Sequence, residues 1–425
     1  MQEIEEIAKI IRQNGGKLYL VGGAIRNRLL KKEAIDEDYC VTGLTKEKFQ
    51  ELFKDAKIQG KDFPVFILEG KEFALARKER KNGKGHKDFE FNTDINITIE
   101  EDLKRRDITI NSIAQDVLTK EIIDPFNGIE DLNNRIIRKT GDAFKEDPLR
   151  VYRVARFASI LDFKVDKETL KDMENLKQEL KFLSKERVYE EFKKALKSDR
   201  PSIFFEILKD VNVLDVHFKE MYDLIGKTQP EEYHPEGDSY CHTMIAVDNS
   251  TKITDKLEYR FSVLVHDLGK GVTPKEMLPH HYGHDEKGIE LVSKLGNRLG
   301  VPKNWVKCGK TACKWHMKAG IFSQMTARKK VIMIEQVGKS LLGLEGLKVV
   351  VACDRNKENE DILKTFNQIE FDEIGNRCLK EINGDLIKKE YPNLEGKKIC
   401  DKLHERRTNW MKLIDMDNTI KYNRK

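Results

Sequence analysis

The segment Leu18–Val41 is the part of this chain that most constrains its fold. It begins with an apolar run, passes through Gly22-Gly23 into a stretch of helical composition, and ends in a second β-type run that contains Asp36 and Asp38. An apolar run that meets glycines and then helical spacing predicts a strand, a tight turn and a helix. The sequence therefore predicts an α/β unit with two carboxylates on a strand beside the turn.

The two carboxylates predict a metal-dependent site. Side chains two residues apart share a strand face and lie roughly 6 to 7 Å apart, so Asp36 and Asp38 can converge on two divalent ions about 3.5 to 4 Å apart. Gly22 and Gly23 lack Cβ atoms, so the helix N–H groups can approach a triphosphate, with Arg26 as a charged clamp. Gly-Gly alone is usually a turn and Asp-x-Asp usually a solvated edge, but their order here favours nucleotidyl transfer.

Length and charge limit the classes of protein. A chain of 425 residues predicts two to four units with ample apolar content for cores. The 78 Lys and Arg nearly balance the 73 Asp and Glu, so no uniformly basic nucleic-acid coat is expected. A polyanion would therefore be bound by local basic patches, such as residues 77–87 and 104–106. The alternative interpretation of each patch is a solvated helix face.

Cysteine usage favours a reducing compartment. The seven cysteines are scattered and show no CxxC spacing, so neither a zinc ribbon nor a disulfide framework is expected. The N-terminal residues are acidic, and no apolar run approaches the roughly 20 residues that a membrane span needs. We expect a soluble cytoplasmic protein with no membrane partner, as a monomer or homodimer.

The pattern along the chain predicts an α+β protein. Residues 1–140 mix short β-type runs with helices, and the pattern then turns helical. We expect a nucleotidyltransferase head over 1–140, a helical neck over 141–228, a histidine-rich domain over 229–340 and a helical tail over 341–425. The polar segment 229–237, with two prolines, is interpreted as a linker.

Further motifs give the chain a resemblance to a known family. Lys104-Arg105-Arg106-Asp107 leads to Asn111 before an apolar stretch, and Glu146-Asp147-Pro148-Leu149-Arg150 opens the neck. With these motifs the chain resembles the class II CCA-adding tRNA nucleotidyltransferases of the polymerase β-like superfamily, in the bacterial type that carries an HD domain. The resemblance covers nearly the whole chain.

The resemblance implies stepwise addition of C, C and A to tRNA 3′ ends from CTP and ATP, without a nucleic-acid template. It implies that Asp36 and Asp38 are catalytic and hold Mg²⁺. It also implies that Asp107 and Asn111 recognise the sugar or order a motif. For these two residues, helix capping is the alternative. The residues that would contact the nucleotide are Gly23, Arg26, Arg106, Arg150 and Arg153.

Base selection can be argued from chemistry. Cytosine and adenine both present an exocyclic amino donor beside a ring-nitrogen acceptor, whereas uracil and guanine present the opposite order. Asp147 accepts and Arg150 donates, and the two are i, i+3 neighbours, so together they can read the donor–acceptor edge. For Asp147 and Arg150, an ordinary salt bridge on the neck helix is the alternative.

The sequence departs from the family pattern after Arg26. This chain has Asn27 there, where the family usually has an Asp.

The histidines predict a second site. His266 directly precedes Asp267 and Leu-Gly-Lys-Gly, with His242 before and His284 after, and this order resembles the HD phosphohydrolase superfamily. Imidazole and carboxylate ligands suit Mn²⁺, Ni²⁺ or similar ions. His266 and Asp267 are expected to be catalytic ligands, with His242 and His284 beside them. His316 and Asp354 are weaker ligand candidates. His280 and His281 are interpreted as substrate contacts or as loop residues.

In the family, such an HD segment implies 2′,3′-cyclic phosphodiesterase and 2′-phosphatase activity that repairs tRNA ends. The alternative is a poly(A) polymerase of the same superfamily, which typically has a long basic tail and no HD site. The HD motif and the balanced charge disfavour it. Transfer RNA is expected to be bound by shape and phosphate contacts, with Arg406, Arg407 and Lys412 as candidates in the tail.

Overall fold

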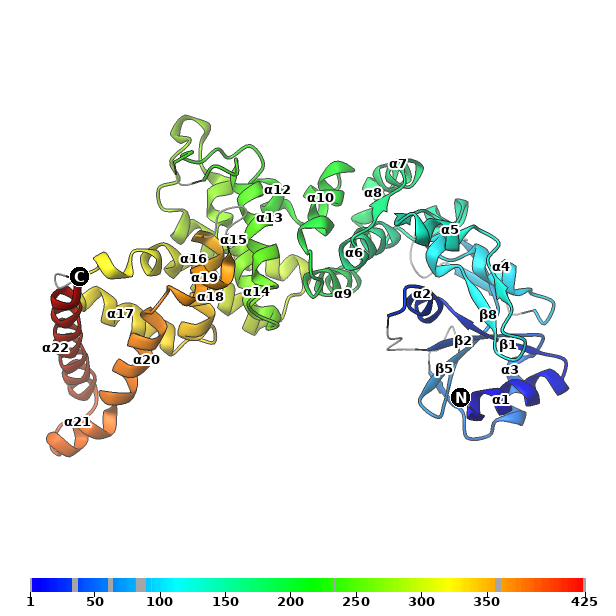
Figure 1. The fold of residues 1–425 in the computed structure, drawn as a ribbon, viewed down its shortest axis with the longest axis horizontal. Helices are drawn as coiled ribbons and strands as arrows, with labels where there is room; N and C mark the ends of the chain where they lie inside the picture. The colour runs from blue at the N-terminus through cyan, green and yellow to red at the C-terminus, as the bar shows by residue number, and fades with distance from the viewer. Residues whose placement is uncertain are drawn as a thin grey trace. The chain divides into compact units, whose positions relative to one another are not determined.

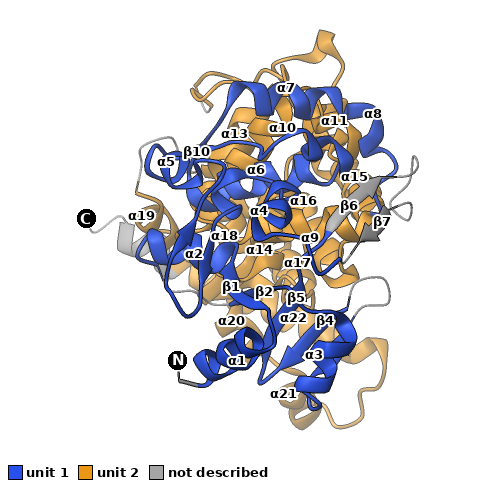
Figure 2. Cartoon of the chain, turned by 90° about the vertical axis from the view of Figure 1, so that its right-hand side faces the viewer, with its two compact units in different colours: residues 1–184 blue, residues 185–425 orange. Residues whose placement is uncertain are grey.

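The computed structural model describes residues 2–32, 37–59, 64–81, 89–92, 94–232, 234–355 and 361–422. The chain falls into two compact units, residues 1–184 and residues 185–425 (Figure 2). Among the described residues, none of the helices is both long enough and apolar enough to cross a membrane. The α+β fold class is confirmed: the sheet lies in the first unit, and the second is helical (Figure 1).

Unit 1 is built on a seven-stranded sheet of order β3-β4-β5-β2-β1-β8-β9. Strand β1 lies between β2 and β8 and is antiparallel to both, whereas β2 is parallel to β5. The strands of this sheet are β1 (Lys17–Val21), β2 (Asp38–Thr42), β3 (Lys57–Gln59), β4 (Val65–Leu68), β5 (Lys71–Leu75), β8 (Ala114–Asp116) and β9 (Ile122–Ile123). A separate ribbon pairs β6 (Lys78–Lys81) with β7 (Phe89–Asn92).

Successive side chains of β1 point to opposite faces of the sheet and pack into a different apolar cluster on each face. Leu18 and Leu20 pack on one face with a core that includes Phe49, whereas Tyr19 and Val21 face a smaller cluster on the other. The helices of this unit are α1 (Gln2–Gln13), α2 (Gly23–Leu29), α3 (Lys46–Leu52), α4 (Ile99–Lys104), α5 (Gly128–Asn133), α6 (Arg150–Leu161), α7 (Lys167–Asn175) and α8 (Lys177–Leu180). Short 3₁₀ turns η1 (Thr109–Asn111) and η2 (Asp142–Glu146) precede α6, and β10 (Ile136–Ile137) pairs with β11 (Lys164–Val165).

Unit 2 is an assembly of helices around a large apolar core that includes Trp315, Ile334 and Leu347. Its helices are α9 (Lys185–Leu196), α10 (Ser202–Asp210), α11 (Leu214–His217), α12 (Lys219–Tyr222), α13 (Ser239–Ser250), α14 (Leu257–Val265), α15 (His284–Leu299), α16 (Lys303–Gly320), α17 (Ala327–Gly338), α18 (Gly343–Arg355), α19 (Ile362–Asn367), α20 (Phe371–Glu381), α21 (Gly384–Glu390) and α22 (Lys397–Tyr422). The 3₁₀ turns are η3 (Leu268–Val272), η4 (Lys275–Met277) and η5 (Phe322–Gln324).

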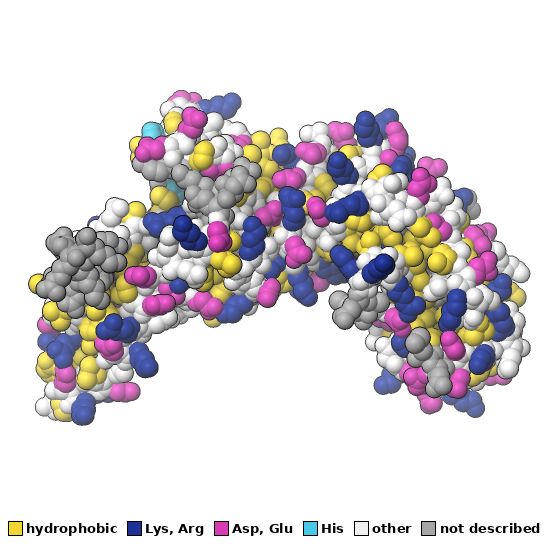
Figure 3. All heavy atoms as spheres, viewed as in Figure 1, with side chains coloured by type: hydrophobic (Ala, Val, Ile, Leu, Met, Phe, Trp, Pro, Cys, Tyr) yellow, Lys and Arg dark blue, Asp and Glu magenta, His cyan; other side chains and the backbone are white. Residues whose placement is uncertain are grey.

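The surface agrees with the balanced composition. On the face shown in Figure 3, Lys and Arg side chains lie interspersed with Asp and Glu over the described parts of both units. All seven cysteines lie in described segments, and each is a free thiol. This agrees with the expectation that the cysteines form no disulfide framework.

Candidate functional site

The turn between β1 and α2 brings four predicted residues of the head together. Gly22 has φ +69°, a conformation that glycine adopts without strain. A Cβ atom at Gly22 would lie 3.2 Å from Nη1 of Arg106, and one at Gly23 would lie 3.5 Å from Nη2 of Arg26. Two guanidinium groups therefore lie beside the paired glycines, as a triphosphate site requires.

The acidic strand begins next to this turn. Asp38 opens β2, is exposed and lies opposite Val21 in the antiparallel register. Asp36, predicted to share its face, lies outside the described residues. The intervening Glu37 accepts hydrogen bonds from Arg28 (2.5 Å), Lys71 (2.7 Å) and the Tyr39 hydroxyl (2.8 Å). Glu37 thus fixes the start of β2 to α2 and β5.

A buried chain of hydrogen bonds links α2 to α6. Arg26 Nη1 donates to Asn111 Oδ1 (2.6 Å), and Asn111 Nδ2 donates to Asp107 Oδ1 (3.3 Å). Asp107 Oδ2 accepts from Nε of Arg153 at 2.8 Å. Burial raises the pKa of Asp107, but the charges of Arg153 and Arg150 outweigh it and hold that pKa well below its usual value. Asp107 is therefore ionised at neutral pH and orders the arginines.

Asn27 retains part of the role of the expected aspartate. Its Oδ1 accepts from Nε and Nη2 of Arg26, at 3.2 and 3.0 Å. Burial, and then the charge of Arg156, lower the pKa of Arg26 to about 10, so this guanidinium keeps its charge at pH 7. The amide of Asn27 therefore holds Arg26 in place but does not neutralise it.

The residues predicted to read the base lie at the start of α6. Asp147 Oδ1 accepts from the backbone N–H of Leu149 at 3.1 Å. Arg150 is buried and donates to the carbonyl oxygens of Ala143 (2.6 Å) and Arg105 (2.5 Å). These bonds anchor the first turn of α6 to the segment that follows α4, so Arg150 has a structural role, and its role in reading the base stays a prediction.

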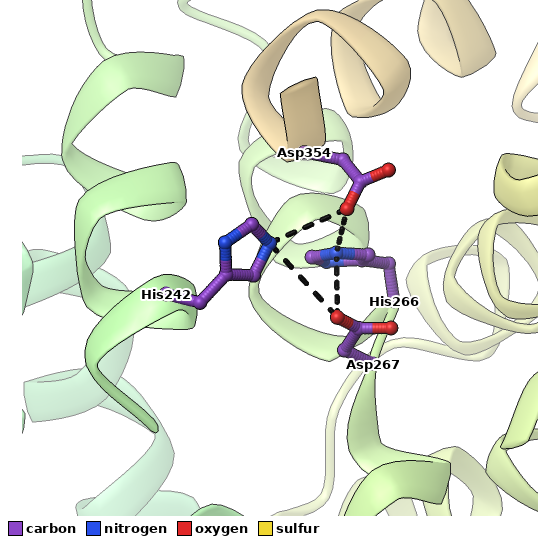
Figure 4. A group of neighbouring side chains, drawn as sticks. All are labelled: His242, His266, Asp267 and Asp354. Carbon is purple, nitrogen blue, oxygen red and sulfur yellow. Dashed lines mark hydrogen bonds and ion pairs between the residues drawn. The ribbon is translucent and has the colours of Figure 1, made fainter. Parts of the chain in front are cut away.

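In unit 2, four side chains from separate elements converge on one point (Figure 4). His242 lies in α13, His266 ends α14, Asp267 precedes η3, and Asp354 lies in the last turn of α18. Nε2 of His242 and Nε2 of His266 each lie 3.3 Å from Oδ1 of Asp354. Asp267 Oδ2 lies 3.3 Å from Nε2 of His266 and 3.9 Å from Nε2 of His242.

A second group shares Asp267. Its other carboxylate oxygen, Oδ1, lies 3.3 Å from Nε2 of His284 and 3.3 Å from Nε2 of His316. His284 begins α15 and His316 lies in α16. The two oxygens of one buried carboxylate thus face two different pairs of ring nitrogens, and both weaker candidates, His316 and Asp354, lie in the cluster.

All four histidines are oriented in the same way. In each, Nδ1 donates to an acceptor outside the cluster, which leaves Nε2 directed inward. The acceptors are Glu236 Oε1 for His242 (2.6 Å), Val263 O for His266 (2.7 Å), His281 O for His284 (2.7 Å) and Cys313 O for His316 (2.9 Å). This orientation is the one that metal-ligating histidines adopt.

The residues present fit divalent metal ions. His242 Nε2 is buried without a hydrogen-bond partner among the described residues, and the two buried oxygens of Asp267 face ring nitrogens and, at Oδ2, Lys270 Nζ at 2.5 Å. Burial raises the pKa of Asp267, but the nearby charges of Lys270 and His266 hold it well below its usual value, so the carboxylate is ionised. An unpartnered buried ring nitrogen beside an ionised carboxylate and three further imidazoles is a set of donors that a divalent ion can take.

Three segments of the chain match models of known protein families. The Poly A polymerase head domain matches residues 18–138, the probable RNA- and SrmB-binding site of polymerase A matches 162–224, and the HD domain matches 239–334. The multifunctional CCA protein of Psychromonas ingrahamii is 46% identical over 305 residues, which cover 70% of this chain and 73% of that protein. The chain belongs to the multifunctional CCA protein family. It is a CCA-adding nucleotidyltransferase with an HD phosphohydrolase domain, and the poly(A) polymerase alternative is not supported.

Solved structures show the same fold at lower sequence identity. The Thermotoga maritima CCA-adding enzyme complexed with tRNA matches with a TM-score of 0.64 at 20% identity. The match covers 95% of this chain and 89% of that enzyme's chain. A CCA-adding enzyme with ATP has a TM-score of 0.64 at 20% identity and covers 95% and 88%. The fold of this multifunctional CCA protein is therefore that of the CCA-adding enzymes.

Sequence reasoning missed several residues of this enzyme. The segment interpreted as a linker supplies Glu236, which orients His242, and Gln229, whose Oε1 accepts from Lys270 at 2.6 Å. No sequence signal marked Glu236, since a carboxylate in a polar loop is ordinary. In the tail, Arg407 is buried against Glu335 and the Ile382 carbonyl oxygen, which disfavours the prediction that it contacts phosphates.

Proposed function

We propose that the head transfers nucleotides from CTP and ATP to the 3′ end of tRNA, with Asp36 and Asp38 holding Mg²⁺. Arg26 and Arg106 beside the paired glycines support the triphosphate site, because two fixed guanidiniums match its charge. The bound ions would activate the 3′-hydroxyl and stabilise the leaving pyrophosphate. Arg153, held by Asp107, extends this positive surface toward the base.

Base selection is proposed to lie with Asp147 and Arg150 at the start of α6. Asp147→Ala is expected to leave the fold intact and to reduce discrimination of CTP and ATP against UTP and GTP by roughly tenfold or more, since one good hydrogen-bonded pair gives about 1–3 kcal/mol of base discrimination. A misincorporation assay measures this selectivity. Unchanged selectivity would leave Asp147 with only a structural role, through its hydrogen bond to Leu149 in the turn before α6.

For the HD site, we propose hydrolysis of 2′,3′-cyclic phosphates and 2′-phosphates at tRNA ends with two divalent ions. The single observation that carries the two-ion arrangement is that Oδ1 and Oδ2 of Asp267 face different histidine pairs. His242, His266 and Asp354 would hold one ion and His284 and His316 the other, with Asp267 shared. Metal ions in such a site supply an activated water and polarise the phosphate. The nitrogen and oxygen donors suit Ni²⁺ or Mn²⁺.

The protein's own groups orient that chemistry. The four Nδ1 hydrogen bonds hold the imidazoles in place, and burial of Asp267 keeps bulk water from its oxygens. Lys270 Nζ lies 2.5 Å from Asp267 Oδ2 and balances its charge. A substrate phosphate would therefore bind to side chains that are already in place, beside a carboxylate whose charge Lys270 balances. Few of these side chains would have to move during the reaction.

Two measurements test the HD proposal. A variant with His266→Ala and Asp267→Ala should keep CCA addition and lose phosphodiesterase activity. Independently of activity, elemental analysis of the metal-loaded protein should give two ions per chain, and one for His316→Ala. Loss of CCA addition together with hydrolysis would show that the segment is structural, and one ion per wild-type chain would contradict the shared carboxylate.

A further inference from the structure

A pocket of about 690 Å³ adjoins the HD ligand groups. Its lining includes the ligands His284 and Asp354 and the adjacent Lys270. It also extends to His280 and Tyr282, which hold no place in either ligand group. The volume lies within the range of small-ligand sites, about 300–1,000 Å³, and exceeds what a phosphate group alone needs.

The loop before α15 presents two stacked rings to this pocket. The rings of His280 and Tyr282 have centroids 5.7 Å apart and an interplanar angle of 25°. Tyr282 is 69% exposed, so most of its ring is uncovered. An exposed aromatic ring in a pocket is a surface on which a flat heterocycle can stack.

The loop that carries the two rings is fixed by His281. Its Nε2 donates to the Thr228 carbonyl oxygen at 2.9 Å, and its Nδ1 accepts from the Thr273 hydroxyl at 2.8 Å. His281 is therefore a loop anchor. Because the loop is held before any ligand binds, stacking on Tyr282 costs little ordering entropy.

Charge and polarity differ between the parts of the lining. Lys270 and Arg355 supply two cations, and Asp354, itself a proposed metal ligand, is the one carboxylate among the described lining residues. Pro279, Met317 and Ile321 add apolar surface. A ligand that fits this lining is anionic at one position and flat and apolar at another, which is the chemistry of a nucleotide.

We propose that this pocket binds the base of the nucleotide whose phosphate is hydrolysed, by stacking it against Tyr282. The inference rests on the proposed phosphohydrolase function and adds the part of the substrate that the metal ligands do not contact. Because every base has a flat face, the site accepts different terminal nucleotides, and it distinguishes a nucleotide from a phosphate ester without a base.

Paired substrates test the base site. Tyr282→Ala is expected to lower kcat/KM for 2′,3′-cyclic AMP by about tenfold or more, mainly through KM, and to leave hydrolysis of the 2,3-cyclic phosphate of 1-O-methylribose unchanged. Tyr282→Phe keeps the ring and should match the wild type. Phe182→Ala removes a similarly exposed ring, 73% exposed, outside the pocket and serves as the control.

An equal loss on both substrates, or no loss on either, would overturn the base site. If the wild type hydrolyses neither compound, the phosphohydrolase proposal fails, and equilibrium dialysis with adenosine 2′-phosphate then decides the base site separately. Binding that weakens in Tyr282→Ala and persists in Tyr282→Phe supports it. Equal binding by both variants and the wild type overturns it.

Discussion

Single carboxylates hold the functional side chains of both units. Asp107 fixes Arg153 in the head, and Glu236 fixes His242 in the HD site. In both cases the carboxylate accepts an N–H of the predicted ligand-binding group and so fixes the orientation of that group. Removing such a carboxylate should change the function of its partner with little effect elsewhere.

Glu236→Ala is expected to weaken metal binding at the HD site about ten- to hundredfold, because His242 loses the acceptor that sets its ring orientation. Glu236→Gln should fall in between, since an amide oxygen can still accept from Nδ1. Competition with a chelator of known affinity measures the change. Glu232→Ala, at an exposed position of the same segment, is the control, and equal affinity in both alanine variants would refute the orienting role.

Glu37 should make head stability depend on pH. Burial raises its pKa, but hydrogen bonds from Lys71 and Tyr39 and the charge of Lys71 outweigh it and lower the pKa to about 2, against 4.5 for a free carboxyl. The stabilisation is therefore present above about pH 4.5 and is lost as the pH falls toward 2. At pH 7, Glu37→Gln should lower the free energy of unfolding by about 1 kcal/mol, a value reduced by solvent screening.

Urea unfolding of the wild type and Glu37→Gln between pH 7 and pH 3, followed by circular dichroism, measures this dependence. The difference between the two proteins should shrink below about pH 4.5. A difference that stays constant over the whole range would show that the ionised carboxylate is not the stabilising species.

At the scale of elements, the HD ligands depend on close contact between η3 and α15. A Cβ atom at Gly269 would lie 1.9 Å from the carbonyl oxygen of His284 and 2.8 Å from the backbone nitrogen of Gly288. Only glycine lets the turn after Asp267 approach α15 so closely. This approach brings Asp267 Oδ1 within 3.3 Å of His284 Nε2.

Gly269→Ala should therefore separate η3 from α15, abolish hydrolysis at the HD site and destabilise unit 2 by about 1–3 kcal/mol, the range for overpacked cores. CCA addition should persist, because the head residues lie in unit 1. Thermal unfolding and both activity assays measure the effect. Gly384→Ala is the control, because its Cβ would meet nothing within 4 Å, and wild-type hydrolysis by Gly269→Ala would contradict the contact.

Elements and motifs were predictable from the sequence where the signal is local. The strand predicted before Gly22-Gly23 and the helix predicted after it correspond to β1 and α2, and His266-Asp267 lies in the HD site. The link from Arg26 through Asn111 to Asp107 was not predictable, because it spans 85 residues and depends on packing of η1 against α2. For the same reason, Asp354 and His316 could be assigned to the cluster only from the structure.

At the scale of the whole molecule, each site is built within one unit. The head residues named above lie in 1–184 and the HD ligands in 185–425. Asp38→Ala should therefore abolish nucleotide addition and leave hydrolysis of 2′,3′-cyclic AMP unchanged. Parallel assays of one preparation measure both activities, and a parallel loss of hydrolysis would show that the two sites are coupled.

The most direct test of the whole account is incubation of the purified protein with a tRNA that lacks its CCA end, Mg²⁺, and each nucleoside triphosphate singly and together. Products are resolved at single-nucleotide resolution. We expect two C residues with CTP alone, and C-C-A followed by a stop when CTP and ATP are both present. A growing A-tract, or no extension at all, would contradict it.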